Sequence, residues 1–204
     1  MHGCLVLMNG SACSGKTTLS KQLQRALCSQ FMSCAPDVLR HTHVVRVWHI
    51  ELDFFEQQVR ESKQEAQHSW SQESWKAAQK HGLETTCAIM KLEASSNDDM
   101  PAFLMNLFVS GQHATAHDGK APTFDVVLVD DNMLKRSSRK KYWLAALENQ
   151  FAFFQICMQT PLDICIARNM LRKTEAKEQA PHVNLLVSDA IVKDTHTHNE
   201  VRSF

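Results

Sequence analysis

The sequence has 204 residues, of which 44% are hydrophobic and 22% are charged, with 22 Lys and Arg balanced by 22 Asp and Glu. This length fits one domain of ordinary size, or one domain with a small appendage. The zero formal net charge excludes a globally basic protein that binds nucleic acid through its overall charge, so RNA binding would need a local basic patch, and we expect no DNA partner.

Two further features of the composition bear on the cellular environment. No apolar run approaches the roughly 20 residues of a membrane span, so we expect no membrane association. The seven cysteines are an odd number and include no Cys-x-x-Cys pair. This pattern is not that of a disulfide scaffold and favours a reducing, cytoplasmic environment.

The first motif follows a short apolar stretch, residues 4–8, that favours a strand. Residues 10–17, Gly-Ser-Ala-Cys-Ser-Gly-Lys-Thr, match the Walker A pattern G-x-x-x-x-G-K-[ST] at every fixed position. Apolar residues then recur every three or four positions, as in a helix. In this strand–loop–helix context, the loop amides and the helix N-terminus bind phosphate groups.

This loop predicts an ATP site. We expect Lys16 to reach the β- and γ-phosphates and the Thr17 hydroxyl to bind Mg²⁺. The expected nucleotide-binding residues are Gly10, Ser11, Ala12, Cys13, Ser14, Gly15, Lys16, Thr17 and Thr18.

Apolar stretches at 43–50, 124–129 and 151–158 predict three more strands. Helical segments separate them, including an insertion at about 54–109, with a loop at about 110–123. Near-continuous apolar strands alternating with helices predict an α/β fold, in which helices cover both faces of a parallel sheet. We expect one P-loop NTPase-type domain over residues 1–175 and a lid remnant with a C-terminal tail at 176–204.

Acidic residues follow two of the predicted strands. Asp130 and Asp131 stand where P-loop enzymes place a carboxylate that orders Mg²⁺, and the spacing leaves open which of them does so. Asp53 ends the second strand, where small P-loop kinases place the carboxylate that accepts the proton of the substrate hydroxyl. The alternative for Asp53 is a helix N-cap, and Glu51 and Glu56 are weaker candidates for the base.

Two groups of basic residues follow the acidic pair. The first group is Lys135, Arg136, Arg139, Lys140 and Lys141. In the second, Arg168 and Arg172 are four residues apart on a predicted helix and project from one face. Arginines at this place in P-loop kinases close over the triphosphate and neutralise the transferring phosphoryl group. The alternative is a solvated, cationic helix end.

The order of these motifs resembles the L-seryl-tRNA(Sec) kinase family, whose members phosphorylate the serine carried by selenocysteine tRNA. The resemblance covers about residues 4–175. It rests on the phosphate loop and on four later features. These are Val-Leu-Val-Asp-Asp-Asn at 127–132, Ser137 and Arg139 before an aromatic-containing helix, Pro-Leu-Asp at 161–163 and Arg-Asn-x-x-Arg at 168–172.

The resemblance implies an ATP- and Mg²⁺-dependent phosphotransferase of selenocysteine synthesis that uses an alcohol group as acceptor. Asp53 would act on the seryl hydroxyl, while Lys16, Arg168 and Arg172 would stabilise the phosphates. The residues expected at the acceptor end of the tRNA are Lys135, Arg136, Arg139 and Lys140.

The sequence departs from this family at three places. Met-Leu-Lys-Arg at 133–136 replaces an aromatic pair, Glu56 replaces an arginine, and we find no counterpart of the helical tRNA-binding domain. Two other interpretations stay open. One is a P-loop kinase for a nucleoside or another small metabolite, like the nicotinamide riboside kinases. The other is an ATP-regulated tRNA-binding protein that resembles the accessory factor of Elongator.

Overall fold

The computed structural model describes residues 3–34, 44–62, 71–92, 123–179 and 188–197. In these ranges four strands form one parallel sheet in the order β2-β3-β1-β4. The strands are β1 (Gly3–Gly10), β2 (Val44–Glu51), β3 (Thr123–Asp130) and β4 (Ala152–Met158). The helices are α1 (Lys16–Cys34), α3 (Leu52–Ser62), α4 (Gln72–Met90), α6 (Arg136–Glu148), α7 (Leu162–Gln179) and α8 (Asp189–Thr197). None of these helices has the length and apolarity needed to cross a bilayer.

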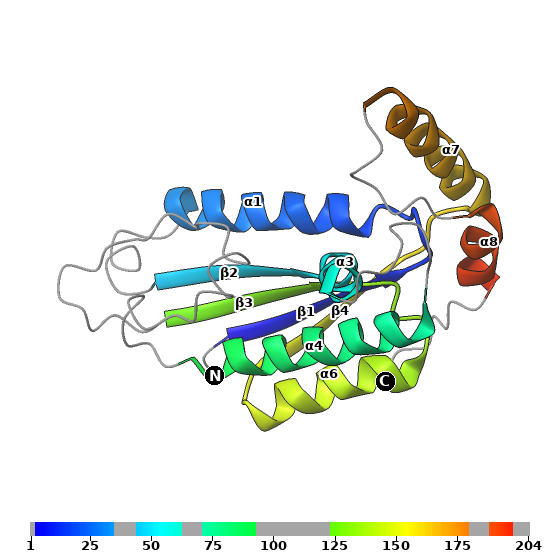
Figure 1. Ribbon diagram of the computed structural model, residues 1–204. Helices are drawn as coiled ribbons and strands as arrows, with labels where there is room; N and C mark the ends of the chain where they lie inside the picture. The colour runs from blue at the N-terminus through cyan, green and yellow to red at the C-terminus, as the bar shows by residue number, and fades with distance from the viewer. Residues whose placement is uncertain (1–2, 35–43, 63–70, 93–122, 180–187, 198–204) are drawn as a thin grey trace.

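Helices cover both faces of the sheet, as predicted: α1 lies along one face, and α4 and α6 lie along the other (Figure 1). Leu5 and Leu7 of β1 pack in the core beneath α4 and α6. Their neighbours Cys4 and Val6 pack in the core beneath α1. Because successive side chains of a strand point to opposite faces, each strand contributes to both cores, which explains the near-continuous apolar runs.

A buried ion pair joins β2 and β3 near their amino ends. Arg46 donates from Nε and from one terminal nitrogen to the two oxygens of Asp125, both at 2.8 Å. The indole Nε1 of Trp48 also donates to Asp125 Oδ1, at 2.8 Å. This bidentate geometry satisfies a carboxylate that would be costly to bury alone.

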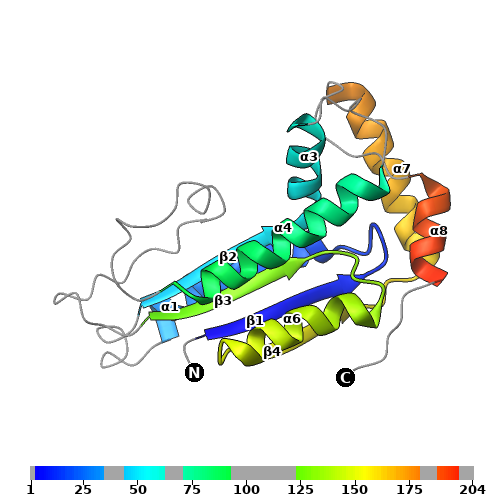
Figure 2. The same ribbon diagram turned by 60° about the horizontal axis from the view of Figure 1, so that its bottom comes forward.

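The strands begin and end within two residues of the predicted positions. The helix after β4, α7, ends at Gln179, so the predicted boundary at residue 175 falls inside it. The expected loop at 110–123 lies outside the described residues except for Thr123, which begins β3. Within the predicted tail, α8 packs against the phosphate loop, at the end of the sheet where α7 also lies (Figure 2).

Candidate active site

The phosphate loop connects β1 to α1 at the carboxyl edge of the sheet, where α3, α7 and α8 also gather (Figure 1). Cys13 has a φ of +61° and Gly15 a φ of +98°. Glycine adopts such angles freely, but at Cys13 the conformation costs on the order of 1–3 kcal/mol, so surrounding contacts must hold it. Backbone of this kind turns successive N–H groups inward as an anion-binding nest above the start of α1.

Lys16 is buried at the centre of the loop, with 7% of its surface exposed. Its ammonium Nζ donates to the carbonyl oxygens of Gly10 at 3.1 Å and Ser11 at 2.7 Å, and to Asn132 Oδ1 at 2.9 Å. Burial lowers the pKa of Lys16, and nearby carboxylates act in the opposite direction. Three oxygen acceptors therefore fix the ammonium at the loop, and the oxygens of a phosphate group are acceptors of the same kind.

Two backbone hydrogen bonds bring the Asp-Asp-Asn segment to this loop. The N–H of Asp131 donates to the carbonyl of Met8 at 3.4 Å, and the N–H of Gly10 donates to the carbonyl of Asn132 at 3.2 Å. These bonds continue the pairing of β1 with β3 beyond the ends of the strands. They explain why Asn132, which is far from Lys16 in the sequence, can accept a hydrogen bond from its ammonium group.

Asp130 is the last residue of β3 and lies on the sheet face that α1 covers, since Val126 and Leu128 pack on that face. Its Oδ2 is buried without a hydrogen-bond partner. Nε2 of His49 lies 3.6 Å from this oxygen. The predicted Mg²⁺ ligand Thr17 is the second residue of α1. Asp130 therefore lies on the same side of the sheet as Thr17.

Asp131 has a different environment. Burial, together with the negative charge of Asp53, raises its pKa to about 7. The N–H of Met133 donates to Asp131 Oδ2 at 3.3 Å, while Oδ1 is buried without a hydrogen-bond partner. The Tyr142 hydroxyl is also buried, and its burial and the charge of Asp131 both raise the pKa of Tyr142. Asp131 is thus coupled to Asp53 and to α6.

Asp53 lies in the first turn of α3, and its side chain is exposed to solvent on one side. The protein packed around the rest of the side chain raises the pKa of Asp53, as do the charges of Asp130 and Glu51. Lys16 is close enough to lower that pKa. Because α3 begins before Asp53, the residue does not occupy the N-cap position considered above. Asp53 therefore combines access to solvent with electrostatic contact to the phosphate loop.

The arginines of α7 reach the phosphate loop from one helix face, as predicted. Arg168 donates to the carbonyl oxygens of Ser14 at 3.0 Å and Cys13 at 3.5 Å. Arg172 approaches the Cys13 thiol, with 3.8 Å between the guanidinium nitrogen and Sγ. Both arginines are nevertheless exposed residues. Their guanidinium groups are thus held against the phosphate loop.

The four residues predicted to contact RNA differ in their exposure to solvent. Arg139 is fully buried, and its guanidinium donates to the carbonyls of Met133 at 2.7 Å and Leu134 at 2.9 Å. The prediction that Arg139 contacts tRNA phosphates is therefore wrong, because its charge is used to hold the segment after the Asp-Asp-Asn motif. The other three side chains are exposed at the start of α6: Lys135, Arg136 and Lys140.

Sequence reasoning missed three side chains of the site. Asn132 and Asn169 stand inside motifs that were recognised, but no role was assigned to them. Asn169 Oδ1 accepts from the Cys13 thiol at 3.7 Å. Thr195 of α8 accepts a hydrogen bond from the backbone N–H of Ala12 at 3.1 Å, and no sequence pattern marks it.

Comparison with solved structures supports the class of protein that this architecture defines, a P-loop protein with a kinase-like fold. An inferred kinase from Chloroflexus aurantiacus J-10-fl has a TM-score of 0.58 at 13% identity, covering 100% of this chain and 83% of that one. Kti12 from Chaetomium thermophilum, in complex with ADP-AlF3, has a TM-score of 0.57 at 15% identity, covering 96% and 80%. A chain of the Pnkp1/Rnl/Hen1 RNA repair complex has a TM-score of 0.54 at 12% identity, covering 97% of this chain and 44% of that one, so this protein spans less than half of it. At these identities the similarity shows the fold alone.

Sequence comparison identifies the family. Residues 3–180 match the family described as "Chloramphenicol phosphotransferase-like protein", and the chain belongs to this family. A search of curated proteins found no match. The resemblance to the seryl-tRNA(Sec) kinases therefore stays a prediction about the acceptor.

Proposed function

We propose that the protein transfers the γ-phosphoryl group of ATP to the seryl hydroxyl of seryl-tRNA(Sec), giving O-phosphoseryl-tRNA. The observation that carries a phosphotransferase is the geometry of the phosphate loop: the Lys16 ammonium is fixed on the carbonyls of Gly10 and Ser11, and the Arg168 guanidinium donates to the carbonyl of Ser14. The acceptor is inferred from the motif resemblance, in which Asp-Asp-Asn at 130–132 precedes Arg-Asn-x-x-Arg at 168–172.

The residues present fit a Mg²⁺ ion. Oxygen ligands suit this ion, which in phosphoryl-transfer sites takes one or two protein ligands besides phosphate oxygens and water. Thr17 offers a hydroxyl, and Asp130 offers a buried carboxylate oxygen that lacks a hydrogen-bond partner. When bound, Mg²⁺ neutralises charge on the β- and γ-phosphates. We assign it to Thr17 and Asp130 rather than Asp131, since the first two share one side of the sheet.

The side chains of this protein can then support the transfer itself. Asp53 orients the acceptor hydroxyl and accepts its proton as the oxygen–phosphorus bond forms and the bond to the ADP leaving group breaks. Lys16, Arg168 and Arg172 stabilise the negative charge on the phosphoryl oxygens. A raised pKa suits Asp53 to this role, because a stronger base takes the proton more readily.

The exposed cations at the start of α6 provide the local patch that a neutral protein needs for RNA. Lys135, Arg136 and Lys140 follow the Asp-Asp-Asn segment directly, so they lie near the carboxyl edge of the sheet. Contacts between such side chains and RNA phosphates position the substrate without reading its sequence. Binding through this patch should weaken as the salt concentration rises.

The test is incubation of the protein with labelled ATP, Mg²⁺ and seryl-tRNA(Sec), followed by release and identification of the amino acid. Phosphoserine supports the proposal. Deacylated tRNA(Sec) is the matched control, and Lys16→Ala should abolish transfer. ATP consumption without phosphoserine would refute the proposed acceptor, and wild-type transfer by Lys16→Ala would refute the assignment of the phosphate loop.

A small molecule with a hydroxyl group is a second candidate acceptor. Phe54 is 41% exposed and directly follows Asp53, so an apolar ring surface lies beside the proposed base. ADP release with a panel of small alcohols, measured without tRNA, would support this acceptor. A slow, tRNA-stimulated ATPase activity that yields no phosphorylated product would instead indicate a regulatory protein of the Elongator-accessory type.

A further inference from the structure

We propose that Thr195 of α8 is a positioning residue for ATP binding, because its hydroxyl holds the phosphate loop in the conformation that accepts a polyphosphate. This inference rests on the ATP site proposed above and assigns part of its affinity to a helix that contributes no residue to the Walker A motif.

The central contact is buried. Thr195 Oγ1 accepts a hydrogen bond from the backbone N–H of Ala12 at 3.1 Å, across 183 residues of sequence. The same hydroxyl donates to the carbonyl of Val192 at 3.1 Å. This second bond orients the hydroxyl so that a lone pair of the oxygen is available to Ala12. Thr195 and Ala12 are both 6% exposed, so water would not readily replace the Thr195 hydroxyl as acceptor if the hydroxyl were removed.

The amide that Thr195 holds precedes the strained residue of the loop. Cys13 has a φ of +61°, which a side chain other than glycine adopts only when its surroundings require it. Its thiol donates to Asn169 Oδ1 at 3.7 Å, and its carbonyl accepts from Arg168 at 3.5 Å. A hydrogen bond from α8 therefore fixes the loop at Ala12, and hydrogen bonds from α7 fix it at the left-handed residue Cys13.

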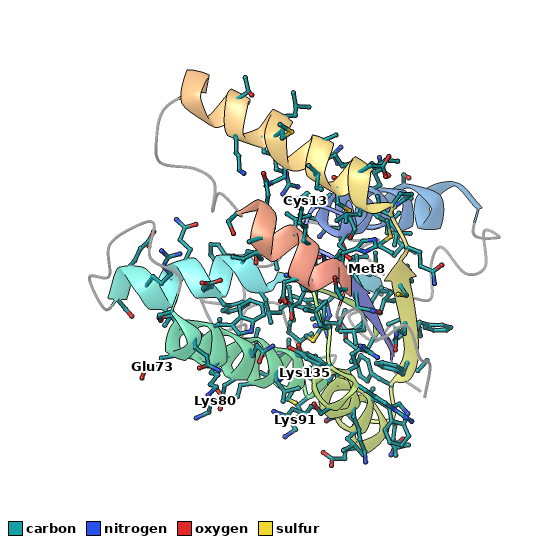
Figure 3. The ribbon with its side chains drawn as sticks, turned by 90° about the vertical axis from the view of Figure 1, so that its right-hand side faces the viewer. Met8, Cys13, Glu73, Lys80, Lys91 and Lys135 are labelled. Carbon is teal, nitrogen blue, oxygen red and sulfur yellow. The ribbon has the colours of Figure 1, made fainter. Side chains whose placement is uncertain are left out.

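A second set of contacts fixes α8 itself. Asp189 Oδ1 accepts from Asn169 Nδ2 and from Lys173 Nζ, both at 2.7 Å. Val192 is fully buried against the cluster that contains Ala12 and Cys13. Figure 3 shows Cys13 between α7 and α8. Since α7 also carries the arginines, α8 joins the phosphate loop and the arginine helix into one unit.

Loss of the Thr195 hydroxyl would leave the Ala12 N–H buried without its acceptor. The loop would then populate other backbone conformations, in which the nest amides no longer converge, and ATP would have to restore the nest as it binds. The apparent affinity for ATP then falls in proportion to the fraction of the protein whose loop is in the binding-competent conformation. The chemical step on the acceptor should change little once ATP is bound.

The test compares three variants by ATP titration calorimetry and by steady-state kinetics. Thr195→Val keeps the shape and removes the hydroxyl, and Thr195→Ser keeps the hydroxyl. Thr197→Val is the matched control on the same helix, since Thr197 is exposed and its hydroxyl donates to the carbonyl of Lys193, within α8. We expect Thr195→Val to raise the Kd and KM for ATP about five- to thirtyfold with kcat within about threefold, and the other two variants to match wild type within about twofold.

The outcomes separate this inference from the proposed function. If the wild type binds no ATP, the proposed function fails. If the wild type binds ATP and a folded Thr195→Val binds it equally well, only the positioning role of Thr195 is overturned. Should Thr195→Val not fold, hydrogen exchange of the wild type decides. The Ala12 amide should exchange slowly without nucleotide, and fast exchange there would overturn the inference.

Discussion

Replacing Asp53 with Asn is the most direct test of the proposed chemistry. The substitution preserves the shape of the side chain and removes its ability to take a proton. Burial and the charges of Asp130 and Glu51 raise the pKa of Asp53, so its ionised form costs stability at neutral pH, and Asp53→Asn should be as stable to unfolding as the wild type or more stable. A positioned general base contributes about 10²–10⁴-fold to rate, so we expect kcat for phosphoryl transfer to fall by that factor.

Binding of ATP should respond in the opposite sense. Asp53 interacts electrostatically with Lys16 and Arg172, so its negative charge acts on the phosphate loop. The Asn variant should therefore bind ATP as tightly as the wild type or more tightly. Glu51→Gln is the matched control: Glu51 is also acidic and two residues away, but it forms a partly exposed ion pair with Lys21 at 3.6 Å. Single-turnover transfer and ATP titration on both variants separate the chemical step from binding.

The pH dependence gives a second readout of the same residue. Burial and the charges of Asp130 and Glu51 raise the pKa of Asp53, so kcat/KM should increase with pH through a pKa above the usual range of an aspartate. Below that pKa the base is protonated and inactive. The acidic limb should disappear in Asp53→Asn. A variant with kcat within about threefold of wild type, or with the limb intact, would refute the role of Asp53 as base.

Three further predictions address the loop, the buried carboxyl and the core. Gly15→Ala should weaken ATP binding about tenfold in a titration, since φ is +98° and the new Cβ would lie 3.2 Å from the Arg168 guanidinium; an unchanged Kd would contradict the loop geometry. The pKa of Asp131 is about 7 in the folded protein and near 4 when unfolded, so its burial costs stability increasingly as pH rises from about 4 to about 7. Asp131→Asn should therefore match wild type in urea unfolding near pH 4 and exceed it at pH 8, by at most about 4 kcal/mol; equal stabilities at pH 8 would contradict this. Arg46→Met should cost about 3–5 kcal/mol in the same assay, because it leaves Asp125 buried without its guanidinium partner, whereas ATP affinity of the folded variant should be retained.

The elements that sequence reasoning predicted well are those with a local signature. The phosphate loop is recognisable because its chemistry needs glycine, lysine and a hydroxyl at fixed spacing, and the strands are recognisable because burial on both faces leaves few polar residues in them. Arg139 shows where this reasoning fails. An arginine in a basic run suggests a solvated surface, but the carbonyls of Met133 and Leu134 need a donor that regular secondary structure does not supply.

Thr195 illustrates a second limit. Its partner Ala12 is 183 residues away, and a threonine near the end of a short helix has many uses that look alike in the sequence. Nothing local distinguishes its buried hydroxyl from the exposed hydroxyl of Thr197. Only the packing of α8 on the phosphate loop gives these two threonines different roles.

The adjacent carboxylates Asp130 and Asp131 have different environments because of the geometry of β3. Successive residues at the end of β3 face opposite sides of the sheet, so Asp130 lies on the side of α1 and Thr17, while Asp131 interacts with Tyr142 of α6, and both carboxylates interact with Asp53. A buried carboxyl with a pKa of about 7 is costly to stability, and groups perturbed in this way are concentrated at functional sites. Its position beside Asp53 therefore fits a site that handles the hydroxyl of a second substrate.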